Sequence, residues 1–339
     1  MLFFLTALAL GGEVEVRKEF LYEQAPFPSC HASTVVALGP DELLAAYFAG
    51  KDEGAPDVAI WLSRGKRQSD GAWTWDPPEL AHREPNVPCW NPVLFLAKKP
   101  DGGEELLLFL KAGPSPERWS GFLKRSADRG KTWTAAELLP AGILGPVRSK
   151  PIQMPDGRLI CGSSVESYKA WGCWVEITPD LGKTWSKHGP INVPGHPRGI
   201  IQASVFSLGG DKLAFLARAG RQIGTLVRSE SNDGGLTWTQ AVKTPLPNPD
   251  AGADCTMLAD GRLCVIYNDS PRFRLPLRLA LSSDGGKTFT PSVILESEPP
   301  GEYSYPALVQ ASDGTLHATY TWRRQKIRHA TIPLAALVK

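Results

Sequence analysis

Short apolar runs, each bounded by turn residues, recur along the chain. Examples are LLAAYFAG at 43–50, LLLFLKAG at 106–113 and KLAFLARAG at 212–220. Runs of this length and composition, rich in aliphatic and aromatic residues, are typical of β-strands. No long stretch has the period of an amphipathic helix. The pattern therefore predicts an all-β protein built from many short strands.

The apolar runs are grouped into six similar units. In each unit a polar residue begins a first strand, a turn leads into a second apolar strand, and a third strand follows. The six first strands begin at His31, Asn91, Lys150, Gln202, Asp254 and Tyr305, with spacings of 60, 59, 52, 52 and 51 residues. A nearly constant period of this size indicates a repeat architecture such as a propeller.

A second phrase recurs between the units, with the form Ser/Thr-x-Asp-x-Gly-x-Thr-Trp/Phe. Its four copies are 126–133, 178–185, 231–238 and 282–289, which start 52, 53 and 51 residues apart. The Asp can accept hydrogen bonds from backbone N–H groups just after it, and the Gly allows the positive φ of a tight turn. We therefore expect these phrases to be structural turns. The first unit keeps only a degenerate copy around Ser69-Asp70-Gly71 and Trp73.

The sixth unit lacks both the phrase and a fourth strand. Residues 14–22 (VEVRKEFLY) have the composition of a strand and precede the first complete unit. We expect them to supply the missing outer strand of the last unit, because this pairing leaves no unpaired central edge. The prediction is a six-bladed β-propeller over residues 13–339, one domain, closed by an N-terminal strand in the last blade.

Composition and the N-terminal segment bear on location and partners. The 37 basic and 35 acidic residues give a net charge of +2, which provides no electrostatic footprint for nucleic acid. Residues 1–12 contain an apolar run too short to span a membrane, and this run is similar to an export signal without its basic start. We expect a secreted or periplasmic protein, with a cytoplasmic one as the alternative, and a monomer by default.

The six cysteines show no metal-ligand spacing. We therefore expect buried free thiols, and neither a metal nor a cofactor.

In a propeller the starts of the first strands and the ends of the second strands meet at one mouth of the central channel. Such a mouth is concave and collects polar groups. Arginine binds a carboxylate through two parallel hydrogen bonds, so arginines there favour an acidic ligand. The charged residues expected at the mouth, from second-strand ends and nearby loops, are Lys51, Asp52, Glu53, Lys111, Glu166, Arg218 and Arg274.

The four turn phrases resemble the Asp-boxes of the sialidase (neuraminidase) superfamily, whose members are six-bladed propellers. That family binds a sialic acid carboxylate with three arginines, and it uses a Tyr paired with a Glu as nucleophile and a loop Asp as acid/base. The resemblance implies that Arg218 and Arg274 are two of the arginines and that Tyr303, in the segment Tyr303-Ser304, is the nucleophile. Asp52 or Glu53 takes the acid/base position.

Two positions depart from the pattern of that family. His31 occupies the place of the first arginine, and Gln202 occupies the place of the Glu that pairs with the tyrosine. Because Gln cannot accept the phenolic proton, Glu166 or Glu302 is expected to serve as the base. The further residues expected to bind substrate are Gln202, Asn91, Lys111, Lys150, Asp254 and Tyr305.

Three functions follow as hypotheses. The first is an exo-acting glycoside hydrolase that removes a terminal acidic sugar, with sialic acid as the default. The second is a lyase or hydrolase acting on a uronic-acid glycan, with His31 as acid/base. The third is a propeller that binds glycans without catalysis, since this fold serves many functions.

Overall fold

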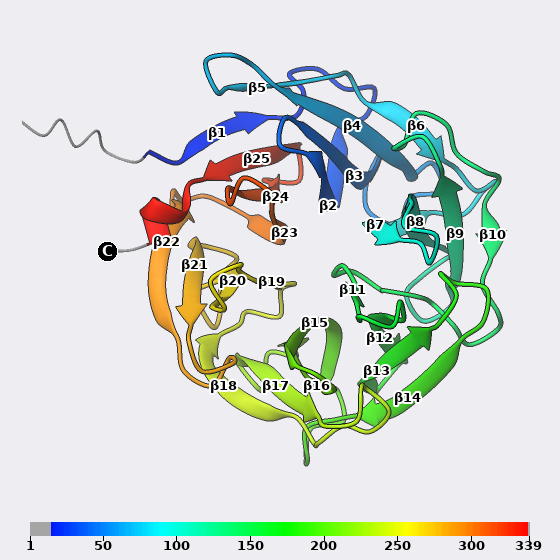
Figure 1. The fold of residues 1–339 in the computed structure, drawn as a ribbon, viewed down its shortest axis with the longest axis vertical. Coiled ribbons are helices and arrows are strands. Elements are labelled where there is room, and N and C mark those ends of the chain that lie inside the picture. Colours follow the sequence, from blue (N-terminus) through cyan, green and yellow to red (C-terminus); the bar gives the residue numbers. More distant parts are fainter. Residues whose placement is uncertain (1–14, 338–339) are drawn as a thin grey trace, which may run out of the picture.

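The computed structural model describes residues 15–337, which form a ring of six β-sheets around a central channel (Figure 1). This arrangement confirms the predicted six-bladed propeller. Each sheet is a blade whose first strand lies nearest the channel, and successive strands follow outward. The expected export segment, residues 1–12, lies outside the described residues.

The first five blades follow one another along the chain. Blade 1 contains β2 (Ser29–Gly39), β3 (Glu42–Gly50), β4 (Ala59–Arg67), β5 (Trp73–Trp75) and β6 (Glu79–His82). Blade 2 contains β7 (Cys89–Lys98), β8 (Glu104–Ala112), β9 (Ser120–Ser126) and β10 (Glu137–Leu138), and blade 3 contains β11 (Ile152–Gln153), β12 (Leu159–Glu166), β13 (Trp171–Thr178) and β14 (Ser186–Ile191). Blade 4 contains β15 (Ile200–Gly209), β16 (Lys212–Ala219), β17 (Thr225–Ser231) and β18 (Val242–Pro247), and blade 5 contains β19 (Asp254–Met257), β20 (Leu263–Asn268), β21 (Leu277–Ser282) and β22 (Thr290–Glu296).

Blade 6 combines both ends of the described chain. It contains β23 (Tyr303–Gln310), β24 (Leu316–Trp322) and β25 (Lys326–Ile332), and its outer strand is β1 (Arg17–Phe20). β1 runs antiparallel to β25, with Arg17 opposite Thr331 and Phe20 opposite Arg328. The predicted closure of the ring by the N-terminal strand is therefore confirmed. A short 3-10 helix, Leu334–Leu337, follows β25.

The core lies between neighbouring blades. β8 shows the effect on sequence: Leu106–Leu110 is an unbroken apolar run, and every side chain in it is almost fully buried. A strand that is covered on both faces needs apolar residues at successive positions, whereas a half-exposed strand alternates. All six cysteines are buried and free, as expected. In the described part of the chain, no helix has the length and apolar character needed to cross a membrane.

The four Asp-box turns connect the third and fourth strands of blades 2 to 5. In the first box, Oδ1 of Asp128 accepts hydrogen bonds from the backbone N–H groups of Lys131 (3.1 Å) and Thr132 (2.9 Å). Ser126 Oγ donates to the same oxygen at 2.7 Å and accepts from the N–H of Gly130, where φ is 80°. The predicted structural role of these turns is confirmed. They lie at the end of each blade opposite the mouth.

The inner strands of four blades share a β-bulge near their starts. The bulges fall where the pairing register shifts, and each contains a residue with positive φ. These residues are Ala32 (55°), Asn91 (21°), Gln202 (60°) and Tyr305 (50°). A bulge redirects a side chain and increases local twist, so it is a common device beside functional sites.

Candidate active site at the channel mouth

Tyr305 lies at the centre of a cluster of arginines at the mouth. The guanidinium carbons of Arg148, Arg218 and Arg274 lie 5.5, 5.8 and 5.5 Å from the centre of its ring. Arg218 comes from the end of β16 and Arg274 from the connection between β20 and β21. The structure therefore brings together the two arginines that the sequence singled out. We call Arg148, Arg218, Arg274 and Arg324 the arginine cluster.

Carboxylates fix the orientation of three members of the cluster. Nε of Arg218 donates to Oδ1 of Asp250 at 2.7 Å, and Arg274 donates to the backbone carbonyl of the same residue at 3.3 Å. Oε1 of Glu302 accepts from both Arg274 and Arg324, at 2.8 Å each. Burial alone would raise the pKa of Glu302, but Arg324 and Arg274 lower it overall. Glu302 is therefore a counter-ion rather than a base.

Arg324 also contacts the loop after β3. Its Nη1 forms an ion pair with Glu53 of that loop, which joins blade 6 to blade 1 at the mouth. Glu53 therefore lies beside the arginine cluster, as expected for a loop acid/base. Asp52 is exposed, and its Oδ1 accepts a hydrogen bond from the N–H of Glu53 at 2.9 Å. Of the two expected acid/base residues, Glu53 is the one tied to the cluster.

Arg148 differs from the other three arginines because its hydrogen-bond partners are neutral. It is buried, and it donates to the backbone carbonyls of Ala253 (2.8 Å) and Pro306 and to Ser149 Oγ. Among residues 15–337 no carboxylate forms an ion pair with it, and its Nε has no hydrogen-bond partner. Burial lowers its pKa. The charge of Asp254, which is paired with Lys150, opposes this lowering. A buried cation without an ion pair of its own, beside Tyr305, favours an anionic ligand.

The hydroxyl of Tyr305 is contacted by two N–H donors. Arg218 Nη1 donates to it, and Gln202 Nε2 donates from 3.4 Å. Both Gln202 and Tyr305 are the positive-φ residues of their bulges, in blades 4 and 6. Gln202 thus stands next to the phenol of Tyr305, and not next to that of Tyr303, with which its place in the sequence had paired it. Two N–H donors stabilise negative charge that develops on the phenolic oxygen.

His31 packs against the other side of this tyrosine. The centres of the two rings are 4.1 Å apart, and Nδ1 of His31 lies 2.9 Å from Thr321 Oγ1. Nε2 has no partner among the described residues. Burial, together with Arg324, Arg274 and the rest of the cluster, holds the pKa of His31 well below its usual value. The imidazole is therefore neutral near pH 7 and has one free ring nitrogen.

Glu166, at the end of β12, is the titratable carboxyl on this side of the mouth. Burial raises its pKa to about 7, and the charge of Arg218 opposes this rise. A carboxyl with such a pKa can both give and take a proton near neutral pH. Asp250 and Glu117 also act on it as like charges. Among the predicted residues, Glu166 is therefore the one suited to acid/base work.

The hydroxyl of Tyr303 does not join the arginine cluster, although the backbone N–H of this residue donates to the carbonyl of Arg274 at 3.0 Å. Its hydroxyl donates to the backbone carbonyl of Glu298 at 2.9 Å, and its ring packs in the core between blades 5 and 6. The expected contact between this phenol and Glu166 or Glu302 is replaced by that backbone bond. The phenol that meets the arginines belongs to Tyr305, two residues later. Tyr305 was expected only to bind substrate.

Several other expected site residues hold the blades together. Lys111 is fully buried, donates to the carbonyls of Asn91 (3.4 Å) and Pro146, and has a pKa lowered to about 7 by burial. Lys150 forms an ion pair with Asp254 at 3.0 Å. Asp254 also accepts hydrogen bonds from Ser204 Oγ at 2.7 Å and from the N–H of Leu308 at 2.9 Å. Lys150 and Asp254 are therefore already paired with each other, and Lys111 is held by neutral carbonyl groups. Asn91 is the bulge residue of blade 2.

Sequence reasoning missed Arg148, Arg324 and Asp250. Arg148 lies two positions before Lys150, the polar residue that begins the third unit in the sequence pattern. Arg324 lies in the turn after β24 and has φ of 60°, and Asp250 lies in the connection before β19. Turns at the mouth end of a blade are the signal that would have found them. Within residues 15–337 no group of His, Cys, Asp and Glu has the arrangement of a metal site.

Comparison with known proteins gives a matching domain family and solved structures of similar fold. The profile of the BNR repeat-like domain family matches residues 41–318. No curated protein matches the chain. Among solved structures it is similar to a protein of unknown function from Dyadobacter fermentans, with 19% identity, a TM-score of 0.76, and coverage of 94% of this chain and 99% of that one.

Two sialidase structures are also similar to this chain. One is a Hadza microbial sialidase, with 19% identity, a TM-score of 0.75, and coverage of 91% of this chain and 66% of that one. The other is the intramolecular trans-sialidase from Ruminococcus gnavus, with 15% identity, a TM-score of 0.72, and coverage of 94% and 98%. At this identity the likeness concerns the fold. The chain belongs to the BNR repeat-like domain family and has the six-bladed propeller fold of the sialidases.

Proposed function

We propose that this protein is an exo-acting glycoside hydrolase that removes a terminal acidic sugar, with sialic acid as the default substrate. The observation that carries the proposal is the convergence of Arg148, Arg218 and Arg274 on the ring of Tyr305 at the channel mouth. Guanidinium groups in this arrangement bind a carboxylate, and a tyrosine among them can reach the adjacent sugar carbon.

The charge balance of the site supports an anionic substrate. The arginine cluster provides four cations, whereas three carboxylates pair with its members: Asp250, Glu302 and Glu53. The pKa of Glu166 is raised to about 7, so this carboxyl is only partly ionised at neutral pH. One positive charge is therefore left to be matched by a single substrate carboxylate, and the unpaired Arg148 is its centre.

In the proposed mechanism Tyr305 is the nucleophile. Its oxygen attacks the anomeric carbon, the glycosidic bond breaks, and the leaving oxygen takes a proton; water then cleaves the glycosyl-tyrosine in the reverse sense. A neutral phenol is suited to this role because the substrate carboxylate does not repel it. Gln202 cannot accept the phenolic proton, so we assign that task to Glu166. Glu53, paired with Arg324 as a carboxylate, is our candidate for activating the water of the second step, and the leaving oxygen takes its proton from solvent.

Exchange of each tyrosine for phenylalanine tests the assignment. Tyr305→Phe should lower kcat for a fluorogenic sialoside by a factor of about 1,000 or more while leaving binding of the acidic sugar within a few-fold, because only the nucleophilic oxygen is lost. Tyr303→Phe is the matched control and should keep near wild-type turnover. Loss of turnover in Tyr303→Phe with full activity in Tyr305→Phe would return the nucleophile to the position that the resemblance first implied.

A second candidate is supported by the free Nε2 of His31. A neutral imidazole beside arginines that neutralise a carboxylate can remove the proton next to that carboxylate, which leads to elimination from a uronic-acid glycan. Assay of a uronide panel for the ultraviolet absorbance of an unsaturated product distinguishes this reaction from hydrolysis. In that case His31→Ala should abolish turnover.

A further inference from the structure

Two buried histidines and a glutamate are hydrogen-bonded in a row at the seam where blade 6 meets blade 1 (Figure 1). Nδ1 of His317, on β24, lies 3.0 Å from Nε2 of His329, on β25. Nδ1 of His329 lies 2.5 Å from Oε1 of Glu19, on β1. The two imidazole rings are stacked, with their centres 5.2 Å apart and 17° between their planes. We call Glu19, His329 and His317 the seam cluster.

Strand β5 of blade 1 covers the seam cluster. The ring centre of Trp73 lies 5.1 Å from that of His317 and 5.7 Å from that of His329. The ring centre of Trp75 lies 5.2 Å from that of His329. His317 is 1% exposed and His329 is fully buried. Water therefore reaches the two imidazoles only when β1 or β5 moves away from blade 6.

Few other charged groups face the seam cluster. Asp313, in the turn between β23 and β24, and Arg67, at the end of β4, form an ion pair of 3.1 Å, and both act on His317. Strand β5 contributes no titratable side chain. Arg17 of β1 donates to the carbonyl of Asp70, in the turn between β4 and β5, at 2.8 Å. The two elements that cover the histidines are therefore also fastened to each other.

The seam cluster can hold one additional proton but not two. One hydrogen lies between the facing nitrogens of the histidines, and a single positive charge on the pair is matched by the carboxylate of Glu19. A second proton would place two cations in contact and put a hydrogen on each facing nitrogen, with no second counter-ion. Burial, and next the charge of His329, lower the pKa of His317 to about 3, and the charge of Asp313 opposes this lowering.

The sign of this shift makes acid unfavourable for the closed seam. An exposed histidine takes up a proton below its ordinary pKa of about 6.5, whereas His317 in the closed protein stays neutral far below that pH. Its contribution to closure is therefore complete above pH 6.5 and is lost as the pH falls toward 3. Strand β1 has four residues, and Arg17 and Lys18 are exposed, so it is the element that opens at least cost.

We propose that the seam cluster is an acid-sensitive latch, in which protonation of both histidines releases β1 and β5 and opens the ring between blade 6 and blade 1. Blade 6 carries Tyr305 and Arg324. The backbone N–H of Cys30, next to His31, donates to the carbonyl of Arg324 at 2.9 Å across the same seam. Opening therefore disturbs the arginine cluster whatever ligand it binds. The protein holds its ligand at neutral pH and releases it in acid, while the other blades stay folded.

Hydrogen–deuterium exchange of the full-length protein measures the opening. Between pH 7 and pH 4.5 the protection of residues 15–22, corrected for the intrinsic pH dependence of exchange, should fall about 100-fold, because the exposed histidine binds a proton two pH units below its ordinary pKa. Protection of β16, in blade 4, should stay constant. His317→Asn keeps a hydrogen-bonding group but cannot become charged, so residues 15–22 of this variant should remain protected at both pH values.

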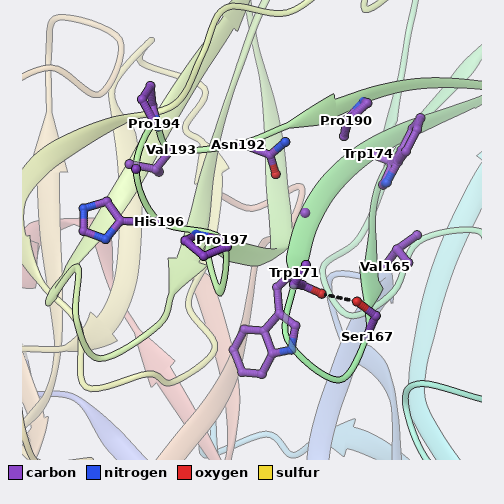
Figure 2. A pocket seen from close by; sticks show the side chains of 13 residues that line it. Val165, Ser167, Trp171, Trp174, Pro190, Asn192, Val193, Pro194, His196 and Pro197 are labelled. Carbon is purple, nitrogen blue, oxygen red and sulfur yellow. Dashed lines mark hydrogen bonds between the residues drawn. The ribbon is translucent and has the colours of Figure 1, made fainter.

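His196→Asn is the matched control. This histidine lies across the ring, in the connection between β14 and β15, where it lines a pocket on blade 3 (Figure 2). The variant loses a titratable imidazole without touching the seam, so residues 15–22 should lose protection in acid as they do in wild type.

Three results would overturn the latch: constant protection of residues 15–22 in the wild type, an equal loss in wild type and His317→Asn, or a loss shared by every blade. If His317→Asn does not fold, His317→Phe takes its place, since a phenyl ring keeps the stacking on His329 and Trp73 and carries no proton.

Discussion

The identity of the central tyrosine depends on a single backbone angle. In a regular strand Tyr303 and Tyr305 would point to the same face, because side chains alternate. The bulge at Tyr305, with φ of 50°, breaks this alternation. Tyr303 therefore packs between blades 5 and 6, whereas Tyr305 packs against His31 in the channel. Positive φ in a bulky residue is uncommon, and it occurs here at the residue whose ring is contacted by three arginines.

Residue-scale features were only partly predictable from the sequence. The pattern identified Arg218, Gln202 and His31 because each ends or begins an apolar strand, whereas Arg274, in the connection between β20 and β21, was found through the family resemblance. It missed Arg148 and Arg324 because a side chain in a connection has no periodic signal. It also misplaced Lys111 at the open mouth, since strand position gives no depth along the channel. Whether a charge is free or already paired is set by neighbours far away in the sequence.

Glu166 predicts a specific dependence of stability on pH. Its pKa is raised by burial from 4.5 to about 7 in the folded protein, so its contribution to stability is complete below pH 4.5 and is lost as the pH rises through about 7. We expect Glu166→Gln to remove this loss. Urea unfolding of both proteins at pH 4.5 and pH 8 measures it: the variant should gain stability relative to wild type at pH 8. An identical pH dependence in the two proteins would contradict the assigned burial.

At the scale of elements, a buried ionic network positions the segment that ends at Arg148. Glu176, in the third strand of blade 3, accepts hydrogen bonds from the N–H groups of Leu144 (3.0 Å) and Gly145 (2.7 Å). Lys111, from blade 2, donates to the carbonyl of Pro146 in the same segment. The segment is thus bound by blade 2 and by blade 3. The position of Arg148 therefore depends on how these two blades pack against each other.

The Asp-boxes were the most predictable elements because all their partners are local. Asp180 accepts hydrogen bonds from the N–H groups of Lys183 (3.0 Å) and Thr184 (2.8 Å) and from the hydroxyl of Thr184 (2.7 Å). We expect Asp180→Ala to lower the free energy of unfolding by about 1–3 kcal/mol, because several donors lose their acceptor. Activity of the folded variant should stay unchanged, since the box lies at the end opposite the mouth.

The degenerate first box provides the control for this prediction. Asp70 accepts a backbone hydrogen bond from Ala72 at 3.0 Å, whereas the hydroxyl of Thr74, four positions later, bonds with Gln68 and with the carbonyl of Lys66 instead of donating to the aspartate. Asp70→Ala should therefore cost much less stability than Asp180→Ala in the same denaturant titration. Equal losses at the two positions would contradict the assignment of this stability to the hydrogen bonds of the complete box.

At the scale of the whole molecule, the ring depends on the outer strand β1. Glu19 contacts Nδ1 of His329 at 2.5 Å, Lys18 donates to the carbonyl of Leu295 at 2.7 Å, and Phe20 packs edge-on against Trp322 with ring centres 5.2 Å apart. Without β1, the edge of β25 would be left unpaired and open to association.

Removal of the chain through Phe20 tests this dependence. We expect the shortened protein to unfold at a lower temperature and to associate through the edge of β25. A synthetic peptide of residues 15–22, added in excess, should restore the unfolding temperature because it binds the folded ring. A peptide of the same composition in scrambled order is the control. Unchanged thermal unfolding of the shortened protein, followed by circular dichroism, would show that three strands suffice for blade 6.

The shared blade also sets the order in which the molecule can be assembled. Glu19 and His329 meet although 310 positions separate them in sequence. Contacts between residues so far apart in the sequence form late in folding, because a long loop must close before they contribute any stabilisation. Tyr305 and Arg324 belong to the blade that this contact completes. A nascent chain that is still emerging from the ribosome can contain five blades and most of the arginines, but it lacks Tyr305, around which the arginines gather. Affinity for the substrate is therefore expected only after the ring has closed.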